Sequence, residues 1–299
     1  MKIEAVVKNI VERFAGMYTK EQAQIIAWWL LEALTKKSRT QLITDQNYEI
    51  SPDQYETLKT WLTEHIEQHK PLAYIIGSIP FCDLSIKIEP PLLIPRPETE
   101  EWVLHFINEV RNAGIATFSL LDLCTGSGCI ALAVANAFPK ATIFASDINP
   151  HALACAQENA KRNDITNVTF MPSDLFAAFN DKHFDFIVAN PPYISYQEKD
   201  SLEPSVREWE SPQALFADDH GYALIKKIIT QAPHYFTLSE SIKHSMLPMI
   251  CIEIGYQQGS VVSTHMKQHG YTDVQIRTDY AGHDRVVCGR YTRDTATIT

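Results

Sequence analysis

The sequence lacks long apolar runs and any excess of positive charge. No stretch of about 18 apolar residues occurs, so we expect no membrane span. Acidic residues (36) outnumber Lys and Arg (26), and the formal net charge of −10 argues against broad binding of DNA or RNA through their phosphates. The start, Met1–Ala5, opens an amphipathic stretch and not a signal peptide. We therefore expect a cytoplasmic protein without a membrane partner.

Motifs for metal binding and redox chemistry are missing as well. The six cysteines form no CxxC pair, and none of the 11 histidines belongs to an HExxH motif. We interpret the cysteines as reduced thiols and expect no metal. The hydrophobic (45%) and charged (21%) contents are those of a globular protein. A chain of 299 residues favours a main domain with a smaller one.

Glycine and proline are scarce near the N-terminus, where helical patterns dominate. Val7, Ile10 and Phe14 recur at spacings of three and four, which is typical of an amphipathic helix. Ser51-Pro52 precedes a further apolar series, with the serine as an N-cap and the proline at the first helical position. We predict a small helical domain at residues 1–75.

The rest of the chain alternates between strand-like and helical segments, which predicts a doubly wound, mainly parallel α/β sheet. The expected parallel strands lie at 119–124, 142–147, 168–172, 184–190 and 249–254. Two further runs, 274–278 and 285–290, are too close in sequence for a parallel crossover and should form an antiparallel hairpin. We place this domain at 98–292, after a linker at 76–97 that contains a β-hairpin, and expect a tail at 293–299.

The first parallel strand runs into a glycine turn, Cys124-Thr125-Gly126-Ser127-Gly128, and then into a helix. Glycines let the backbone approach a ligand, and a helix N-terminus offers unpaired N–H groups. Alone, this turn also fits the dinucleotide pattern GxGxxA. Asp147 ends the second strand about 20 residues later, where a carboxylate can accept from both ribose hydroxyls. The two features indicate an adenosine-type ligand without saying which one.

Asp174 and Leu175 follow the third strand. The carboxylate of Asp174 could accept from an adenine amine while Leu175 covers the ring, although Asp174 would equally suit a helix N-cap. Together the three strand ends predict a nucleoside pocket at the carboxyl edge of the sheet.

The fourth strand runs into Asn190-Pro191-Pro192-Tyr193. Two prolines hold the chain stiff and leave carbonyls as its hydrogen-bonding groups. If the Asn190 side-chain oxygen and the Pro191 carbonyl each accept an N–H of a planar NH2 group, the nitrogen is fixed and gains electron density. Tyr193 can lie against that planar group. We therefore predict methyl transfer to an amide or aromatic amine nitrogen, with all four residues catalytic and substrate-binding.

The chain resembles the release factor glutamine methyltransferases, the PrmC/HemK family. The segments that carry the resemblance are Pro71–Gly77, Leu93–Glu100, Asp122–Gly128, Asn190–Tyr193, Glu253–Gly259 and Ala281–Arg285. The resemblance implies a class I S-adenosylmethionine-dependent methyltransferase domain behind a helical domain that helps to dock the substrate. Such a domain is Rossmann-like, with a seven-stranded, mainly parallel sheet and a C-terminal antiparallel hairpin.

The implied reaction is methylation of the glutamine side-chain amide in the Gly-Gly-Gln (GGQ) motif of class I peptide chain release factors, with S-adenosylhomocysteine as the second product. The implied cofactor contacts are Cys124–Gly128, Asp147, Leu175 and Asn190, to which the residue pattern adds Asp174. We expect a monomer that binds release factors and makes no direct nucleic-acid readout. Cys124 stands where the family usually has glycine, and residues 238–248 lack its Pro-Gly-Gly turn.

Other functions stay open from the sequence. Ribosomal-protein glutamine methyltransferases share the tetrapeptide but differ around Pro95-Arg96. Nucleic-acid adenine or guanine amino-methyltransferases hold a flipped base with a related clamp, although they normally carry a basic surface. A nicotinamide-dependent dehydrogenase or a non-catalytic nucleotide-binding module would use the glycine turn and Asp147, but would leave Asn190–Tyr193 unexplained.

Overall fold

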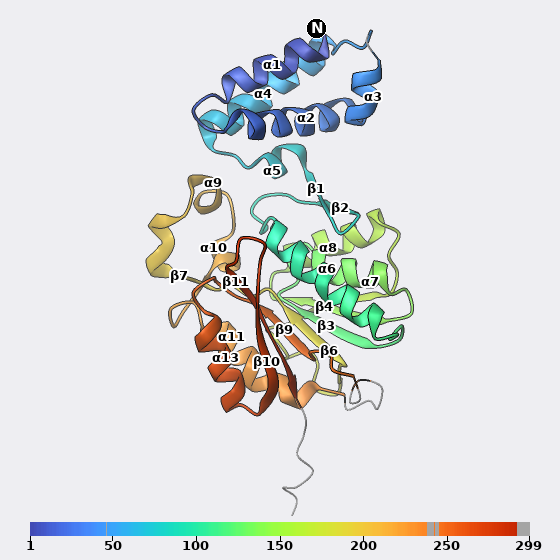
Figure 1. Cartoon of the computed structure of the whole chain (residues 1–299), viewed down its shortest axis with the longest axis vertical. Coiled ribbons are helices and arrows are strands. Elements are labelled where there is room, and N and C mark those ends of the chain that lie inside the picture. Colours follow the sequence, from blue (N-terminus) through green and yellow to red (C-terminus); the bar gives the residue numbers. More distant parts are fainter. Residues whose placement is uncertain (46, 238–241, 243–244, 292–299) are drawn as a thin grey trace, which may run out of the picture. The chain divides into compact units, whose positions relative to one another are not determined.

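The computed structural model describes residues 1–45, 47–237, 242 and 245–291. The expected tail at 293–299 and most of the segment 238–248 lie outside the described residues. The chain forms two compact units: Met1–Gly77 with Pro204–Trp209, and Ser78–Glu203 with the chain from Glu210 onward (Figure 1). This division differs from the expected one because 78–97 belongs with the second unit and 204–209 with the first. None of the described helices is long and apolar enough to cross a membrane.

The first unit is helical. Its elements are α1 (Ile3–Arg13), α2 (Lys20–Thr35), α3 (Arg39–Thr44), α4 (Pro52–Gln68), α5 (Leu72–Ile76) and the short α9 (Pro204–Arg207). Ser51 caps α4 as the sequence predicts: its hydroxyl accepts from the Gln54 N–H at 3.1 Å, and the Gln54 side chain accepts from the Ser51 N–H at 2.9 Å. This reciprocal pairing satisfies two N–H groups that a helix start otherwise leaves open.

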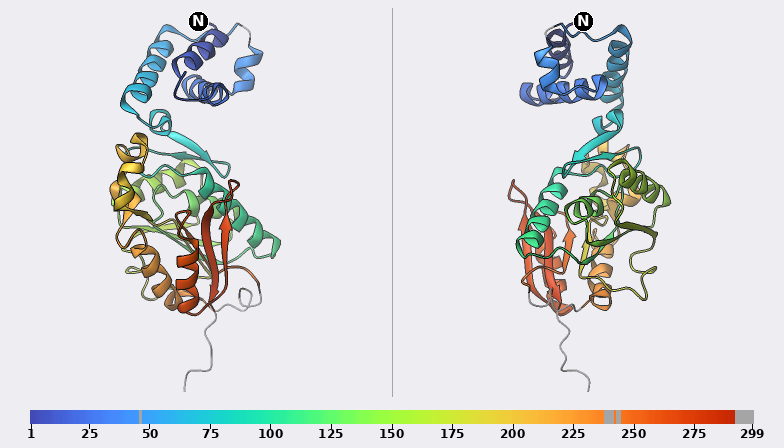
Figure 2. Two further views of the ribbon diagram at one scale, coloured as in Figure 1. Left: turned by 60° about the vertical axis from the view of Figure 1, so that its left-hand side comes forward. Right: turned by 90° about the vertical axis from the view of Figure 1, so that its right-hand side faces the viewer.

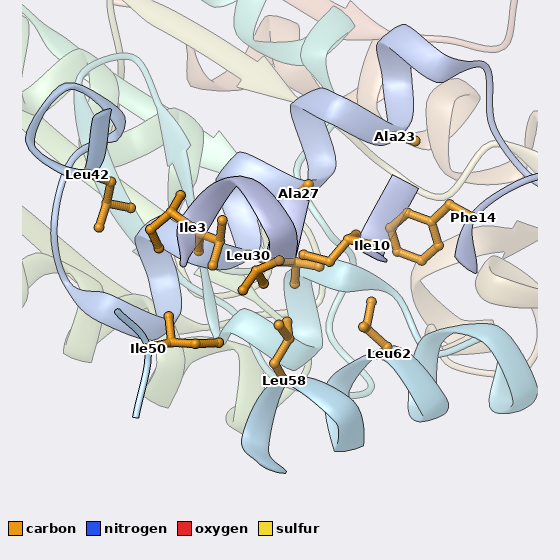
Figure 3. Close-up of a cluster of buried hydrophobic side chains, with 12 residues drawn as sticks. Ile3, Ile10, Phe14, Ala23, Ala27, Leu30, Leu42, Ile50, Leu58 and Leu62 are labelled. Carbon is orange, nitrogen blue, oxygen red and sulfur yellow. The ribbon is translucent and has the colours of Figure 1, made fainter. Parts of the chain in front are cut away.

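One apolar cluster holds these helices together (Figure 3). Ile10 of α1, Leu30 of α2 and Leu58 of α4 are all essentially buried within it. Burial of each such side chain contributes about 1.5–3 kcal/mol before the entropy of ordering it is counted. The first unit therefore has a hydrophobic core of its own.

The second unit is built on a seven-stranded sheet with the order β10-β11-β9-β6-β3-β4-β5. The strands are β3 (Ser119–Leu123), β4 (Thr142–Asp147), β5 (Val168–Pro172), β6 (Phe186–Ala189), β9 (Ile250–Glu253), β10 (Tyr271–Thr278) and β11 (Asp284–Tyr291). The strands from β9 to β5 pair in parallel, while β11 is antiparallel to both β9 and β10. The predicted fold class, including its C-terminal hairpin, is confirmed.

Helices pack on this sheet in two groups. The long helices are α6 (Pro97–Asn112), α7 (Cys129–Ala137), α8 (Pro150–Arg162), α11 (Ala223–Gln231) and α13 (Gly259–Gln268). Helices α6, α7 and α8 lie side by side, as do α11 and α13, and the sheet lies between the two groups (Figures 1 and 2). Shorter elements that the sequence did not predict are β7 (Ile194–Ser195), η1 (Tyr196–Ser201), α10 (Pro212–Leu215), β8 (Phe216–Ala217) and η2 (Ala232–Tyr235).

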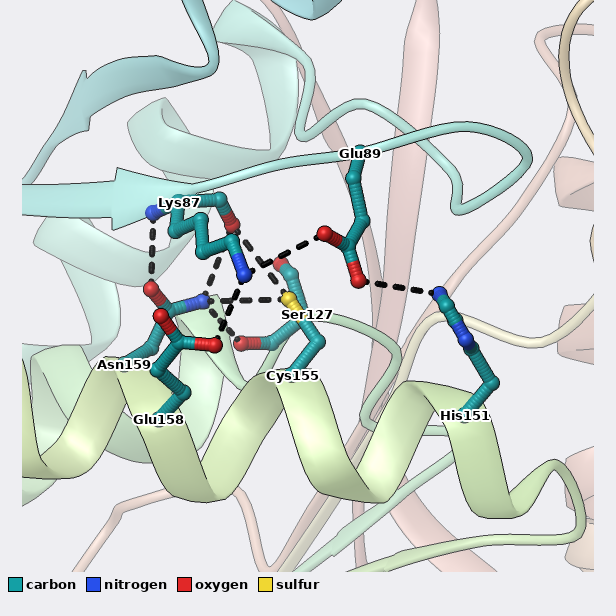
Figure 4. Close-up of polar contacts among 7 residues, drawn as sticks. All are labelled: Lys87, Glu89, Ser127, His151, Cys155, Glu158 and Asn159. Atoms are coloured by element: carbon teal, nitrogen blue, oxygen red, sulfur yellow. Dashed lines mark hydrogen bonds and ion pairs between the residues drawn. The ribbon is translucent and has the colours of Figure 1, made fainter.

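The predicted hairpin consists of β1 (Ser78–Phe81) and β2 (Leu84–Lys87), and β2 pairs with two asparagines: Asn159 in α8 and Asn163 directly after it. The Asn159 side chain accepts from the Lys87 N–H at 2.7 Å and donates to the Lys87 carbonyl at 3.0 Å (Figure 4). Asn163, one helical turn later, makes the same pair of bonds with Ser85 at 3.0 and 3.1 Å. The two side-chain amides thus stand in for a further strand. Asn159 also donates to the Ser127 carbonyl at 2.9 Å, which ties the glycine turn to the hairpin.

Asn159→Ala should lower the free energy of unfolding by about 1–3 kcal/mol, because three backbone groups of Lys87 and Ser127 lose a buried partner. Asn163→Ala is the matched control, since it removes the same bidentate pairing at a more exposed position. Urea denaturation of both variants provides the measurement. An equal or larger loss in Asn163→Ala would contradict this account.

Candidate active site

A cavity of about 210 Å³ opens at the carboxyl ends of the parallel strands in the second unit. Each of four neighbouring strands contributes to its wall. The predicted residues that line it are Cys124 and Gly126 after β3, Asp147 at the end of β4, Asp174 and Leu175 after β5, and Asn190 and Pro192 after β6. The structure therefore brings the glycine turn, the acidic strand ends and the tetrapeptide to one place.

The other predicted residues do not line this cavity. Thr125 and Ser127 are buried inside the turn, where the Thr125 hydroxyl donates to Asp122 at 2.6 Å. Gly128 lies against α8: a Cβ at this position would meet the Ala156 Cβ at 2.9 Å, so only glycine fits without a shift. These three residues form the turn that the cavity residues depend on. Pro191 and Tyr193 also lie outside the lining residues.

Three residues of the turn have left-handed backbone conformations: Cys124, Gly126 and Gly128. Gly126 has φ +55°, and no atom lies within 4 Å of the position that its Cβ would take. Because Gly126 lines the cavity, a ligand can approach its backbone closely. Cys124 has φ +57°, a conformation that costs a residue with a Cβ about 1–2 kcal/mol. Burial raises the pKa of its thiol far above its usual range, so the thiol stays protonated.

Asp147 is anchored by backbone donors. One carboxylate oxygen accepts from the Gly126 N–H and the other from the Asn149 N–H, each at 2.9 Å. Burial raises the pKa of Asp147, while these N–H donors act in the opposite direction by favouring the ionised form. A carboxylate offers about four acceptor sites, so acceptor capacity is left for a ligand hydroxyl beside these backbone donors.

Asp174 is exposed at the cavity, and Leu175 beside it is buried with φ +48°. The alternative interpretation of Asp174 as a helix N-cap is wrong, because a turn and not a helix follows it. Ser173 stabilises that turn instead, since its hydroxyl accepts from the Ala178 N–H at 3.1 Å. Asp174 therefore lines the cavity without serving as a helix cap.

Asn190 presents an unused amide at the cavity. It is half-buried, and its side chain forms no hydrogen bond with any residue in the described part of the chain. Pro191 and Pro192 are buried, and no donor among the described residues reaches the Pro191 carbonyl. Both acceptors that the sequence predicts for a planar NH2 group are therefore available.

Sequence reasoning missed ten lining residues: Leu92, Leu93, Ile148, Asn149, Ala152, Ser173, Ser211, Gln213, Ala214 and Leu224. Ile148 had a local signal, because an apolar residue directly after a strand-end carboxylate is well placed to cover a ring, and its side chain is 55% exposed. The segments around Leu92 and Ser211 had no such local signal in the sequence. They meet through the bond from the Ser211 N–H to the Pro91 carbonyl at 2.7 Å.

An ion pair fixes the second of these segments. The Arg96 guanidinium donates to both oxygens of Glu210 at 2.6 and 2.7 Å, and Glu210 is buried. Burial raises the pKa of Glu210, and the Arg96 charge works against this shift. Arg96 therefore anchors the chain that leads into Ser211 and Gln213.

Across residues 1–45, 47–237, 242 and 245–291, no group of three or more His, Cys, Asp or Glu side chains could hold a metal ion.

Asp122, directly behind the turn, is completely buried. Its Oδ2 accepts from the Thr125 hydroxyl at 2.6 Å and the Ala131 N–H at 3.2 Å, while Oδ1 has no partner among the described residues. Burial raises the pKa of Asp122 from its ordinary value of 3.8 to about 7. The native state therefore binds a proton more tightly here than the unfolded chain does.

This shift predicts a pH-dependent stability. As pH rises from about 4 to 7, the unfolded chain loses the Asp122 proton first, so the free energy of unfolding falls through this window and then levels off. Asp122→Asn keeps the acceptor oxygen and cannot ionise. The free energy of unfolding of Asp122→Asn minus that of the parent should therefore be larger at pH 7 than at pH 4. Denaturant unfolding of both proteins at the two pH values measures this difference. A constant difference across the window would show that Asp122 does not titrate in this range.

The backbone of Cys124 supports a second prediction. Cys124→Gly removes the Cβ that opposes φ +57°, whereas Cys124→Ala keeps the Cβ and removes only the sulfur. The glycine variant should exceed the alanine variant in free energy of unfolding by about 1 kcal/mol, despite the greater flexibility of unfolded glycine. Thermal denaturation compares the two, and a less stable glycine variant would mean that the turn is not strained.

Family models match both units. The model described as "Methyltransferase small domain" matches residues 105–205, and the one described as "PrmC N-terminal domain" matches residues 6–77. Among solved structures, the hMettl16 catalytic domain in complex with a MAT2A 3'UTR hairpin has a TM-score of 0.54 at 16% identity, covering 85% of this chain and 88% of the other. A methyltransferase from Pyrococcus furiosus has a TM-score of 0.50 at 14% identity, covering 81% and 100%. These likenesses support the fold alone.

Curated relatives are much more similar and extend over nearly the whole chain. The release factor glutamine methyltransferase of Thermodesulfovibrio yellowstonii is 36% identical over 96% of this chain and 97% of its own length. Those of Salmonella typhimurium (36%) and Lactococcus lactis (37%) cover 88% and 87% of this chain and 90% of their own lengths. The resemblance inferred from the sequence motifs is confirmed: this chain belongs to the release factor glutamine methyltransferase family.

Proposed function

We propose that this protein transfers a methyl group from S-adenosylmethionine to the side-chain amide nitrogen of the glutamine in the Gly-Gly-Gln motif of class I peptide chain release factors. One observation carries the proposal: the unused amide of Asn190 lines the same cavity as Gly126 and Asp147. The names of the curated relatives support the choice of a release factor glutamine over other planar nitrogens.

The cavity residues fit an S-adenosyl cofactor. Asp147 has acceptor capacity left for the two ribose hydroxyls, and Gly126 leaves room for close approach. Leu175 and Ile148 offer apolar surface for the adenine, with Asp174 near enough to the cavity to accept from its amine. The cofactor supplies an electrophilic methyl group on a sulfonium.

The chain's own task is to hold the nucleophile. An amide nitrogen is a weak nucleophile because its lone pair is delocalised into the carbonyl. When the Asn190 oxygen and the Pro191 carbonyl accept its two N–H groups, the nitrogen is fixed and its developing positive charge is stabilised. Holding reactants in this geometry can supply about 7–11 kcal/mol of the barrier. The nitrogen loses a proton after it has become cationic, so no strong base is needed before attack.

The proposal includes the rest of the expected machinery. Pro192 and Tyr193 keep the acceptor pair rigid and flank the planar amide, while Cys124–Gly128 form the cofactor turn. The helical first unit serves to dock the release factor, and the enzyme acts as a cytoplasmic monomer. The model described as "PrmC N-terminal domain" supports a role for that unit that is particular to this family.

Two substitutions should separate substrate chemistry from cofactor binding. Asn190→Ala should lower kcat by about 100-fold or more while the Kd of S-adenosylhomocysteine changes only a few fold. Asp147→Ala should weaken that Kd by roughly tenfold or more, because it removes charged hydrogen bonds. Labelled S-adenosylmethionine, purified release factor and isothermal titration with S-adenosylhomocysteine give the two readouts.

The matched substrate control is a release factor whose Gly-Gly-Gln glutamine is replaced by alanine, which should take up no label. Mass mapping identifies the modified residue. Label on a ribosomal protein or on a nucleic acid instead would overturn the proposed substrate, and near-normal turnover by Asn190→Ala would overturn the proposed clamp.

A further inference from the structure

Glu253, at the end of β9, is buried directly behind the tetrapeptide. Its side chain is 1% exposed. One oxygen, Oε2, accepts from the Thr99 hydroxyl at 2.7 Å and from the Trp102 indole N–H at 2.8 Å. Thr99 and Trp102 are themselves buried in the first turns of α6. The carboxylate is therefore locked in one orientation by neutral donors from a single helix.

The other oxygen of Glu253 faces Tyr193. The phenol of Tyr193 donates to Oε1 at 3.4 Å, so the tetrapeptide and α6 share one carboxylate. Burial raises the pKa of the Tyr193 phenol far above its usual range, which keeps it a donor. Tyr193 is thus the link between Asn190-Pro191-Pro192 and the interior of the second unit.

The backbone of Tyr193 is held as well. Its carbonyl accepts from the Gln258 side chain at 2.9 Å, and the Gln258 oxygen accepts from the Gly255 N–H at 2.9 Å. Gly221 packs closely against the same carbonyl. A Cβ at position 221 would lie 2.0 Å from the carbonyl oxygen, so a larger residue would not fit without a shift. The main chain is therefore held on this side, and the hydroxyl contact to Glu253 holds the far end of the side chain.

Packing alone does not explain an acidic residue at this position. Among the described residues, the hydrogen bonds to Glu253 come only from neutral side chains. Burial raises the pKa of Glu253, while the hydrogen bonds from α6 and the more distant positive charge of Arg285 act in the opposite direction. A buried carboxylate without a hydrogen-bonded cation is costly, and an apolar side chain of similar volume would usually be at least as stable. Such a group is expected where orientation matters more than stability.

We propose that Glu253, oriented by Thr99 and Trp102, is a positioning residue that fixes the ring of Tyr193 against the substrate amide. It touches neither substrate nor cofactor and acts only through Tyr193. The inference rests on the proposed function, since it needs the tetrapeptide to be the substrate clamp. It adds that residues of α6, which are far from the clamp in sequence, help to hold the clamp in its catalytic geometry.

The sharpest test uses Thr99, because two small substitutions there differ mainly in the hydroxyl. Thr99→Val removes the donor that orients Glu253, and Thr99→Ser keeps it. Thr99→Val should lower kcat for release factor methylation by about tenfold, with the Kd of S-adenosylhomocysteine within about twofold of the parent. Thr99→Ser should retain kcat within about twofold.

A double-mutant cycle with Tyr193→Phe then separates positioning from general stability. Tyr193→Phe keeps the ring and removes the hydroxyl, so it should lower kcat on its own. If Thr99 and Glu253 act through that hydroxyl, Thr99→Val should have less than about a twofold further effect on kcat in the Tyr193→Phe background. The same should hold for Glu253→Gln, which keeps the shape of the side chain. Melting temperatures are recorded for every variant.

The possible results are distinct. A tenfold loss by Thr99→Val in both backgrounds, or a parallel loss of cofactor affinity, would overturn the positioning role and leave a structural one. Unchanged kcat in Thr99→Val and Glu253→Gln would overturn it too. If the parent enzyme does not methylate a release factor glutamine, the proposed function is refuted. If the parent does methylate it, a failure of the variants to behave as expected refutes only the positioning role of Glu253.

Discussion

The parallel register of four neighbouring strands is the constraint on which this site depends. Leu123 of β3 pairs with Ser146 of β4 and with Ala189 of β6, so the residues that follow these strands leave the sheet at one level. Pro172 of β5 is level with Asp147. Because parallel strands end at the same edge, side chains that are distant in sequence become walls of one cavity. A slip of one residue would turn Asp147 toward the other face of the sheet.

The strand ends were predictable because their signals are local. Asp147 and Asn190 each terminate an apolar run, and a run of that kind fixes both the strand and the edge at which it stops. Glycines 126 and 128 were equally visible, since a positive φ is what such a turn requires. These residues therefore follow from the sequence without any knowledge of long-range contacts.

Other parts of the site have no local signature. Gln213 lines the cavity in a segment that is held by long-range contacts, among them the pair between Glu210 and Arg96, more than a hundred residues earlier. Glu253 ends an apolar strand just as Asp147 does, yet it faces Thr99 and Trp102 and not the cavity. Nothing in the strand pattern separates these two acids, because the difference lies in what packs on the strand end. Likewise, the assignment of Pro204–Trp209 to the first unit depends on tertiary packing that the sequence pattern does not express.

The pairing of Asn159 and Asn163 with β2 also bears on whether another chain can add a strand to this hairpin. An edge strand with open N–H and carbonyl groups is a template on which another chain can add a strand. Along β2, the backbone N–H and carbonyl groups of Ser85 and Lys87 are already occupied by the side chains of Asn163 and Asn159. At these two residues, the edge of β2 is therefore closed to intermolecular pairing without a covering strand.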